Sequence, residues 1–272
     1  MRTLLIFSVI FISISSCTRK SSSQAQEYNI LGLSKYNSQD YLGAIGDYNK
    51  AIEIDPKYAK AYYNRGSAKD ELQDHQGAIA DYTKAIEIDP EYANAYYNRG
   101  HSKYNLQDYQ GAISDFTKAI EINPKDAVAY NNRGYSKYNL QDYNGAISDY
   151  NKAIEIDPKF AMAFMDRGSS KYNMQDYQGA IDDYSRAIEI DPMDVKAYIN
   201  RGFTKETIKD FKGAISDYSK TIEISPEYAR AYYVRGLVKR QLDQNDSACL
   251  DLSKALELGD NDANEAIKEF CK

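Results

Sequence analysis

The sequence has no tryptophan and, in 272 residues, only three cysteines, two histidines and six prolines. His75 and His101 lie at unrelated positions, and neither has a cysteine or second histidine at metal-ligand spacing. The chain also lacks a phosphate-binding glycine loop, a dinucleotide fingerprint and a nucleophile elbow. We therefore predict that the protein is not an enzyme and binds no cofactor and no metal.

An excess of basic residues is absent as well. The chain has 34 Lys and Arg against 40 Asp and Glu, a net charge of −6, and no segment gathers Lys and Arg on one side. Binding to phosphate backbones requires a basic stripe. We therefore predict that no nucleic acid is a partner.

Long apolar runs are scarce. The only one, from Leu4 to Ile14, has about eleven residues, whereas a membrane-spanning helix needs about twenty. Arg2 precedes it and small residues follow, which is typical of a secretory signal peptide over residues 1–16. The sequence Ile14-Ser-Ser-Cys17 resembles the bacterial lipobox, and the resemblance implies cleavage before Cys17 and acylation of that cysteine.

Acylation of Cys17 would attach the protein to a membrane. Two or more acyl chains anchor a protein stably, so contact with the membrane is expected only through this lipid anchor. Residues 17–24 are polar and rich in serine, which favours a flexible tether. The resemblance implies a lipid-anchored protein of the bacterial cell envelope, and Thr18 in place of Asp implies the outer membrane in a Gram-negative source. The alternative is a secreted protein with an incidental cysteine.

The rest of the chain is periodic. All six prolines lie 34 residues apart, and the Arg-Gly pairs and Gly-Ala-Ile triplets keep the same period. Such a period indicates a solenoid, in which each helical hairpin buries its apolar face against its neighbours. The seven predicted repeats cover residues 25–58, 59–92, 93–126, 127–160, 161–194, 195–228 and 229–262.

Counted from residue 25, each repeat has an aromatic residue at position 4, Gly at position 8 and Ala at position 20, and six repeats have an aromatic residue at position 24. This pattern resembles the tetratricopeptide repeat over residues 25–262. The resemblance implies an all-α fold, a right-handed superhelical solenoid of antiparallel helix pairs. Residues 263–272 are predicted to form a capping helix on the seventh repeat.

Two positions are predicted to cap the helices. A polar residue, such as Asp55, precedes every proline, and we expect it to cap the first helix of the next repeat with proline at the first helical position. Aspartate at position 16, such as Asp40, is expected to cap the second helices.

Three charged positions depart from the family pattern. Position 7 is Arg in six repeats, position 11 is Lys, and position 23 is Asp in all seven. They form either a charged binding site or internal ion pairs. We favour internal pairs, because a half-buried Arg needs a carboxylate, and we expect a ladder that runs from Asp47 to Arg65 and onward between repeats.

Position 6 carries asparagine in four repeats. It resembles the asparagine ladder of long tetratricopeptide superhelices, in which amides on the concave face bind the backbone of an extended peptide. Tyrosines beside it offer contact area. Alternatively, the asparagines belong to the repeat and bind nothing. The candidate groove residues are Asn64, Asn98, Asn132, Asn200, Tyr63, Tyr97, Tyr104, Tyr138 and Tyr172.

Two cysteines remain besides Cys17. Cys249 and Cys271 form either a disulfide, which an extracytoplasmic location favours, or two free buried thiols.

These observations predict a non-catalytic, membrane-tethered scaffold or adaptor for protein–protein interaction, with a peptide or protein partner in its concave groove. The alternative is a structural component of an envelope assembly, in pilus biogenesis or outer-membrane protein insertion, that uses its convex face or its ends.

Overall fold

The protein is an all-α repeat solenoid. The computed structural model describes residues 23–271, which contain fifteen helices and no strand. The predicted signal peptide and Cys17 lie outside the described residues. The first helix spans residues 23–37 and so already includes residues 23 and 24. These two residues, which the prediction placed in the tether, are therefore helical.

Each repeat is one helical hairpin, and the seventh is followed by the predicted capping helix. The helices after the first are α2 (Tyr41–Ile54), α3 (Ala59–Glu71), α4 (His75–Ile88), α5 (Ala93–Asn105), α6 (Tyr109–Ile122), α7 (Ala127–Asn139), α8 (Tyr143–Ile156), α9 (Ala161–Asn173), α10 (Tyr177–Ile190), α11 (Val195–Thr207), α12 (Phe211–Ile224), α13 (Ala229–Gln241), α14 (Asn245–Glu257) and α15 (Asp262–Phe270).

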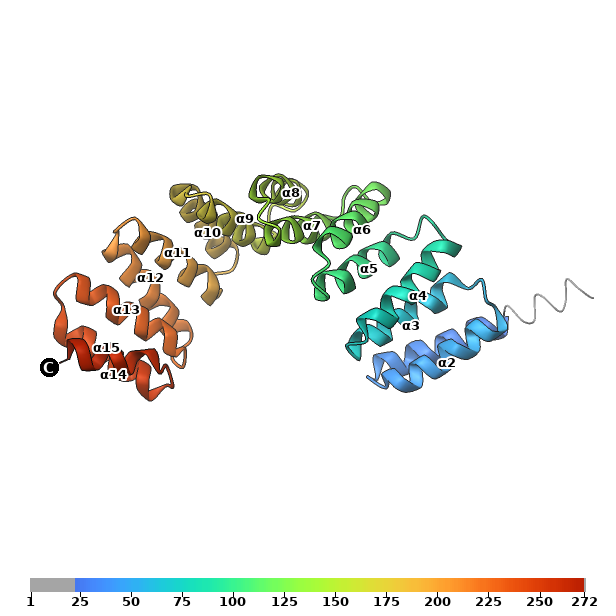
Figure 1. Cartoon of the computed structure of the whole chain (residues 1–272), viewed down its shortest axis with the longest axis horizontal. Helices are drawn as coiled ribbons and strands as arrows, with labels where there is room; N and C mark the ends of the chain where they lie inside the picture. Colours follow the sequence, from blue (N-terminus) through green and yellow to red (C-terminus); the bar gives the residue numbers. More distant parts are fainter. Residues whose placement is uncertain (1–22, 272) are drawn as a thin grey trace, which may run out of the picture. The chain divides into compact units, whose positions relative to one another are not determined.

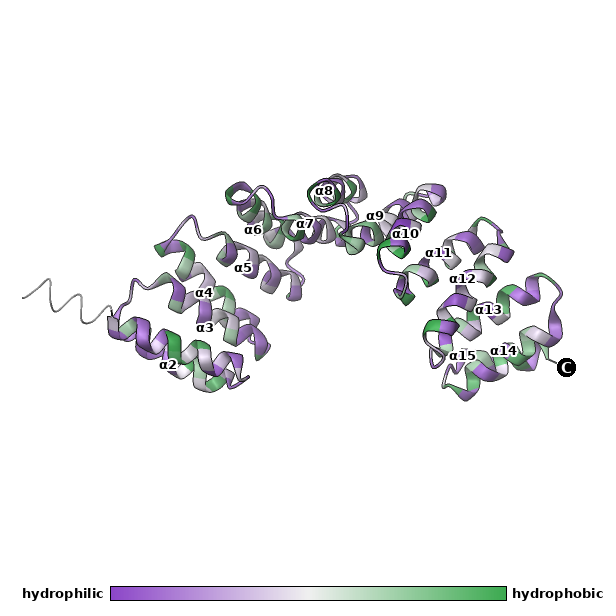
Figure 2. Cartoon of the chain, turned by 180° about the vertical axis from the view of Figure 1, so that it is seen from behind, coloured by the Kyte–Doolittle hydropathy of each residue, from purple (hydrophilic) through white to green (hydrophobic). Residues whose placement is uncertain are grey.

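The chain divides into two compact units, the first ending at Ser136 and the second beginning at Lys137. In each unit consecutive helices lie side by side (Figure 1). The labelled helices carry both hydrophilic and hydrophobic residues (Figure 2), as expected for hairpins that bury one stripe of each helix. Across residues 23–271, no helix has both the length and the apolar character needed to cross a bilayer.

In five hairpins a close contact between glycine and an aromatic ring joins the two helices, and in the last hairpin the glycine meets Leu252 instead. The ring of Tyr82 on α4 lies against Gly66 on α3, where a Cβ atom would approach it to 2.8 Å. Tyr82 and Ala78 on the same helix have no exposed surface. Because interiors are close-packed, the glycine at position 8 is needed to admit the ring at position 24.

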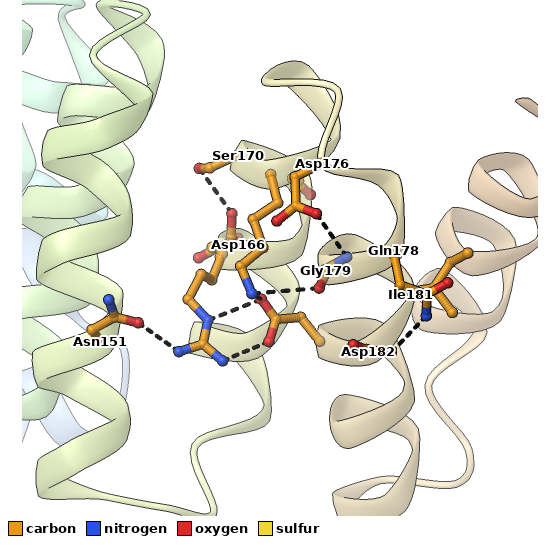
Figure 3. Close-up of polar contacts among 12 residues, drawn as sticks. Asn151, Asp166, Ser170, Asp176, Gln178, Gly179, Ile181 and Asp182 are labelled. Carbon is orange, nitrogen blue, oxygen red and sulfur yellow. Dashed lines mark hydrogen bonds and ion pairs between the residues drawn. The ribbon is translucent and has the colours of Figure 1, made fainter. Parts of the chain in front are cut away.

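The second helices are capped as predicted. Asp40 accepts a hydrogen bond from the backbone N–H of Gly43 at 2.9 Å, and the corresponding aspartates cap α4, α6, α8, α10 and α12 in the same way. Figure 3 shows this bond for Asp176 and Gly179.

The predicted capping of the first helices is wrong. Asp55 is the C-cap of α2, and its carboxylate accepts a hydrogen bond from the backbone of Lys57, so Pro56 lies in a turn. The first helices begin three residues after proline, because this turn reverses the chain between hairpins. Among the first helices from α3 to α13, two have an aspartate cap, made by Asp126 and Asp194.

The charged positions that depart from the family pattern form an ion pair inside each hairpin. Arg99 donates from Nε and Nη2 to both carboxylate oxygens of Asp115, at 2.9 and 2.7 Å, and Lys103 approaches the same carboxylate at 2.7 Å. The aspartate side chain is only 4% exposed. The guanidinium also lies over the ring of Tyr96, 5.5 Å from its centroid. We call this arrangement the Arg–Asp fork.

The arginine of the fork also contacts the preceding repeat. Arg99 donates from Nη1 to Thr83, and Arg167 donates from the same atom to Asn151 (Figure 3). In the first repeat, where position 7 is Leu31, Asp47 pairs instead with Lys35 and Lys50.

The predicted ladder between repeats is therefore wrong in its pairing. Arg65 binds Asp81 of its own repeat and not Asp47 of the repeat before it. The reason is the glycine at position 8, which brings the second helix close. A Cβ atom on Gly100 would lie 3.3 Å from the Cβ atom of Asp115. The carboxylate therefore lies beside the first helix of the same hairpin.

The Arg–Asp fork predicts the effect of removing one carboxylate. Asp115→Ala leaves Arg99 and Lys103 without it in a half-buried site, so the free energy of unfolding should fall by about 1 to 3 kcal/mol. Urea denaturation followed by circular dichroism measures this loss. Glu121→Ala on the same helix removes only an exposed ion pair with Lys118 and should leave stability nearly unchanged. Equal losses in the two variants would contradict a stabilising role for the fork.

Candidate functional site

Three of the four asparagines at position 6 bind the preceding repeat. Asn64 donates from Nδ2 to the amide oxygen of Asn29 at 2.9 Å. Asn98 donates in the same way to the hydroxyl of Tyr63 at 3.1 Å, and Asn132 to that of Tyr97 at 2.7 Å. These amides therefore contribute an internal line of hydrogen bonds between repeats, which leaves less of their bonding capacity for a peptide.

Tyr63 and Tyr97 belong to the same internal line. Tyr63 packs against Tyr92 with ring centroids 4.9 Å apart, and Tyr97 packs against Phe116 at 5.6 Å. Burial raises the pKa of both tyrosines above its ordinary value. Their hydroxyls stay protonated at neutral pH and accept from the asparagines, so these rings are structural parts of the first unit.

Asn200 is different, because no residue within 23–271 makes a hydrogen bond with its side-chain amide. The side chain at position 5 of the preceding repeat is Met165, whose thioether is only a weak acceptor. Asn200 instead lines a hollow of about 240 Å³ in the second unit. The hollow is lined by Tyr138, Ser169, Tyr172, Asn173, Tyr184, Asn200, Phe203 and Thr204.

The hollow lies across three consecutive repeats. Tyr138 comes from α7, Tyr172 and Asn173 come from α9, and Asn200 and Phe203 come from α11. First helices bring these side chains together because positions 6, 9, 12 and 13 share one face of the hairpin row. The structure thus unites three of the predicted groove residues, Tyr138, Tyr172 and Asn200.

Hydrogen bonds and ring contacts hold the walls of the hollow. Asn173 donates from Nδ2 to the hydroxyl of Tyr138 and to the backbone oxygen of Ser169, both at 2.9 Å. The ring of Tyr172 lies 5.7 Å from that of Phe203. These contacts fix the rings before any ligand arrives, which reduces the entropic cost of binding.

The lining of the hollow carries no ionisable acid or base other than tyrosine. Burial raises the pKa of Tyr184 to about 12, an effect that a hydrogen bond with Ser169 partly opposes. This hydroxyl is therefore neutral at physiological pH. Aromatic surface with amide and hydroxyl groups suits an uncharged ligand.

The remaining predicted groove residue, Tyr104, lies in the first unit. Its ring contacts Tyr109 and Tyr135, with centroids 5.3 and 5.5 Å away. Tyr135 is 41% exposed, so this aromatic pair reaches the surface.

Sequence reasoning did not single out Ser169, Asn173, Tyr184 and Thr204. Asn173 occupies position 13, on the same face of the first helix as position 6, so its position was available as a signal. Tyr184 occupies position 24, where the pattern indicates only packing. Its hydroxyl reaches the hollow because Ser169, a small residue, leaves space beside it.

A polar cluster surrounds Asp70 in the first unit. Its carboxylate accepts hydrogen bonds from Ser102 and Tyr82 and lies 3.0 Å from Nδ1 of His75. Ser102 is fully buried and contacts the carboxylate rather than the imidazole, so the cluster lacks the order of a nucleophile and its base. The described residues 23–271 contain no group of three His, Cys, Asp or Glu side chains suited to a metal ion.

Cys249 and Cys271 form a disulfide in the structure, with Cα atoms 5.7 Å apart. It links α14 to the end of α15, whose Ala263 and Ala266 are buried. Gly259, at φ +98°, ends α14 in the left-handed region that favours glycine. The disulfide and this turn hold the capping helix against the last hairpin.

Comparisons with known proteins agree with the repeat architecture. Profiles described as "Tetratricopeptide repeat" match residues 93–126 and 127–160, and residues 195–228 and 229–262. A further profile described as "TPR repeat" matches residues 32–69, 71–107 and 168–207. No curated protein matches the sequence significantly.

Solved structures resemble the chain as well. The crystal structure of MamA has 29% identity, covers 61% of this chain and 96% of its own, and superposes with a TM-score of 0.57. A tetratricopeptide repeat protein from Parabacteroides merdae has 23% identity, coverages of 91% and 97%, and a TM-score of 0.68. YrrB, described as a TPR protein with an unusual peptide-binding site, has 24% identity, coverages of 69% and 97%, and a TM-score of 0.59. The last two likenesses concern the fold alone.

The different bonding of the asparagines predicts different effects on stability. Asn98→Ala removes a hydrogen bond to Tyr63 between repeats and should lower the free energy of unfolding by about 0.5 to 1.5 kcal/mol. Asn200→Ala is the matched control at the same repeat position, and it removes no such bond. Its unfolding curve in urea should coincide with that of the unaltered protein. A larger loss for Asn200→Ala than for Asn98→Ala would refute this assignment.

Proposed function

Because the chain belongs to the tetratricopeptide repeat family, we propose that it is a non-catalytic scaffold that binds an uncharged, extended segment of a partner protein at the hollow of the second unit. The observation that carries this proposal is the amide of Asn200. It lines the hollow and, unlike the amides of Asn64, Asn98 and Asn132, has no hydrogen-bond partner within residues 23–271.

The chemistry of the hollow supports a peptide ligand. The amide of Asn200 offers both a donor and an acceptor, which complement the C=O and N–H of a peptide unit. The rings of Tyr138, Tyr172 and Phe203 provide apolar contact for a side chain beside that unit. A volume of about 240 Å³ is below the range of about 300 to 1,000 Å³ that holds small molecules. It therefore suits one or two side chains of a longer segment.

The proposal includes a location. The signal-like residues 1–16 and the lipobox resemblance at Cys17 support a lipid-anchored protein of the bacterial cell envelope, in the outer membrane of a Gram-negative cell. The partner would then be an envelope protein.

Substitution at the hollow tests the function. We expect the Asn200→Ala, Phe203→Ala double variant to fold, because Phe203 is 51% exposed and the Asn200 amide makes no internal bond. Loss of two neutral contacts predicts roughly tenfold weaker affinity. The measurement is quantitative capture of envelope proteins from detergent-solubilised membranes, followed by titration of the partner identified.

Lys220→Ala provides a control in the same repeat as Asn200. Lys220 forms an exposed ion pair with Glu223, so its removal should leave capture unchanged. If the Lys220 variant loses the partner and the hollow variant retains it, the partner binds a surface outside the hollow. That result would favour the structural role in an envelope assembly.

Substitution of the anchor tests the location. In Cys17→Ser no thiol is left for acylation, and the cells should no longer hold the acylated mature protein in the membrane. Metabolic labelling with a fatty acid, followed by membrane fractionation, measures both effects. An unlabelled natural protein that still sediments with membranes would show that lipid is not its anchor.

A further inference from the structure

Three positions of the first helix face the preceding repeat. Position 6 donates to position 5 of that repeat, as Asn132 does to Tyr97. The arginine at position 7 donates to its position 25, as Arg133 does to Thr117. The ring at position 9 lies against its position 12, as Phe203 does against Tyr172. Positions 6 and 7 therefore contact the earlier repeat, and position 9 does so where it carries a ring, although Phe203 itself stays 51% exposed.

The first repeat has apolar residues at all three positions. Ile30, Leu31 and Leu33 are 64%, 50% and 40% exposed. We call these three residues the N-terminal apolar face. The ends of solenoids are normally polar, because no further repeat covers them. The capping helix α15 follows that rule, since Lys268 and Glu269 on it are exposed.

Another repeat does not fit on this face. Position 3 is alanine in the six later repeats, and each of these alanines has no exposed surface, whereas the first repeat has the exposed Glu27. Burying a carboxylate at that position without a partner is unfavourable. The later alanines are Ala61, Ala95, Ala129, Ala163, Ala197 and Ala231.

A second copy of the chain is also a poor occupant. Three partly exposed aliphatic side chains offer on the order of 200 Å² of apolar surface. A stable dimer buries about 800 Å² on each partner. The face is therefore too small to associate on its own and needs an anchor that holds its partner close.

We propose that the N-terminal apolar face lies against the lipid bilayer. This inference rests on the proposed lipid anchor at Cys17. Residues 17–22 span at most about 20 Å, and the helix adds about 10 Å from residue 23 to Ile30. The short connection gives the face a high effective concentration at the membrane, so a small apolar area is sufficient. Arg19 and Lys20, directly after the cysteine, are attracted to anionic headgroups.

The absence of tryptophan from the sequence permits a direct test. The lipidated full chain carrying Leu31→Trp is placed in vesicles of phosphatidylethanolamine and phosphatidylglycerol, with or without brominated acyl chains. We expect emission at a shorter wavelength than in detergent, and loss of most of the intensity to the brominated lipid. Leu33→Trp provides a second reporter on the same face, with the same expected result.

Leu250→Trp is the matched control, because Leu250 on α14 is 72% exposed and lies in the last repeat. Its emission should stay at long wavelength and unquenched.

Vesicle flotation separates the hypothesis of a lipid anchor from that of docking on the bilayer. A chain that does not float refutes the anchor and the docking that rests on it. A chain that floats with both reporters on the N-terminal face unquenched refutes the docking alone. Emission that shifts with protein concentration but is not quenched identifies a second copy as the occupant and also overturns the proposal.

Discussion

The ion pair between the arginine at position 7 and the aspartate at position 23 holds the repeats together in two directions. In Arg201, two nitrogens of the guanidinium bind the carboxylate of Asp217 in the same hairpin, and the third reaches the hydroxyl of Ser185 in the preceding repeat. A half-buried guanidinium is stable only when its donors are occupied. Folding of one hairpin and its contact with the previous hairpin are thus linked through one side chain.

A second line of contacts runs parallel to the Arg–Asp forks, from the amide at position 6 to the side chain at position 5 of the preceding repeat. The hydrogen bond forms where the side chain at position 5 offers an oxygen, as those of Tyr63 and Tyr97 do. Met165 interrupts it, because a thioether cannot replace the hydroxyl. With methionine at position 5 of the preceding repeat, the amide of Asn200 makes no hydrogen bond there and lines the hollow instead. The candidate site thus lies where the hydrogen bond between positions 5 and 6 of neighbouring repeats is missing.

The sequence was sufficient for the fold, because glycine at position 8 and alanine at position 20 recur in all seven repeats with one fixed period. The caps at position 16 follow from the local sequence pattern. The sequence left open whether Cys249 and Cys271 form a disulfide, which the structure shows. The sequence could not tell which aspartate each arginine pairs with. A strict period makes the aspartate 16 residues after an arginine and the one 18 residues before it equally regular. Only the close approach at glycine selects the first.

For the same reason, the sequence could not tell which of the predicted groove asparagines is free to bind a ligand. Four asparagines at one repeat position look equivalent in the sequence, yet the side chain that decides their role belongs to the neighbouring repeat. Three neighbours offer an oxygen, whereas Met165 does not. All the residues that line the hollow except Tyr184 come from first helices, which arginine contacts tie to the preceding repeat, including Arg167 to Asn151 and Arg201 to Ser185. The residues at position 25 thus support these helices although they do not line the hollow. The proposed binding site therefore rests on the packing between repeats as well as on its own lining.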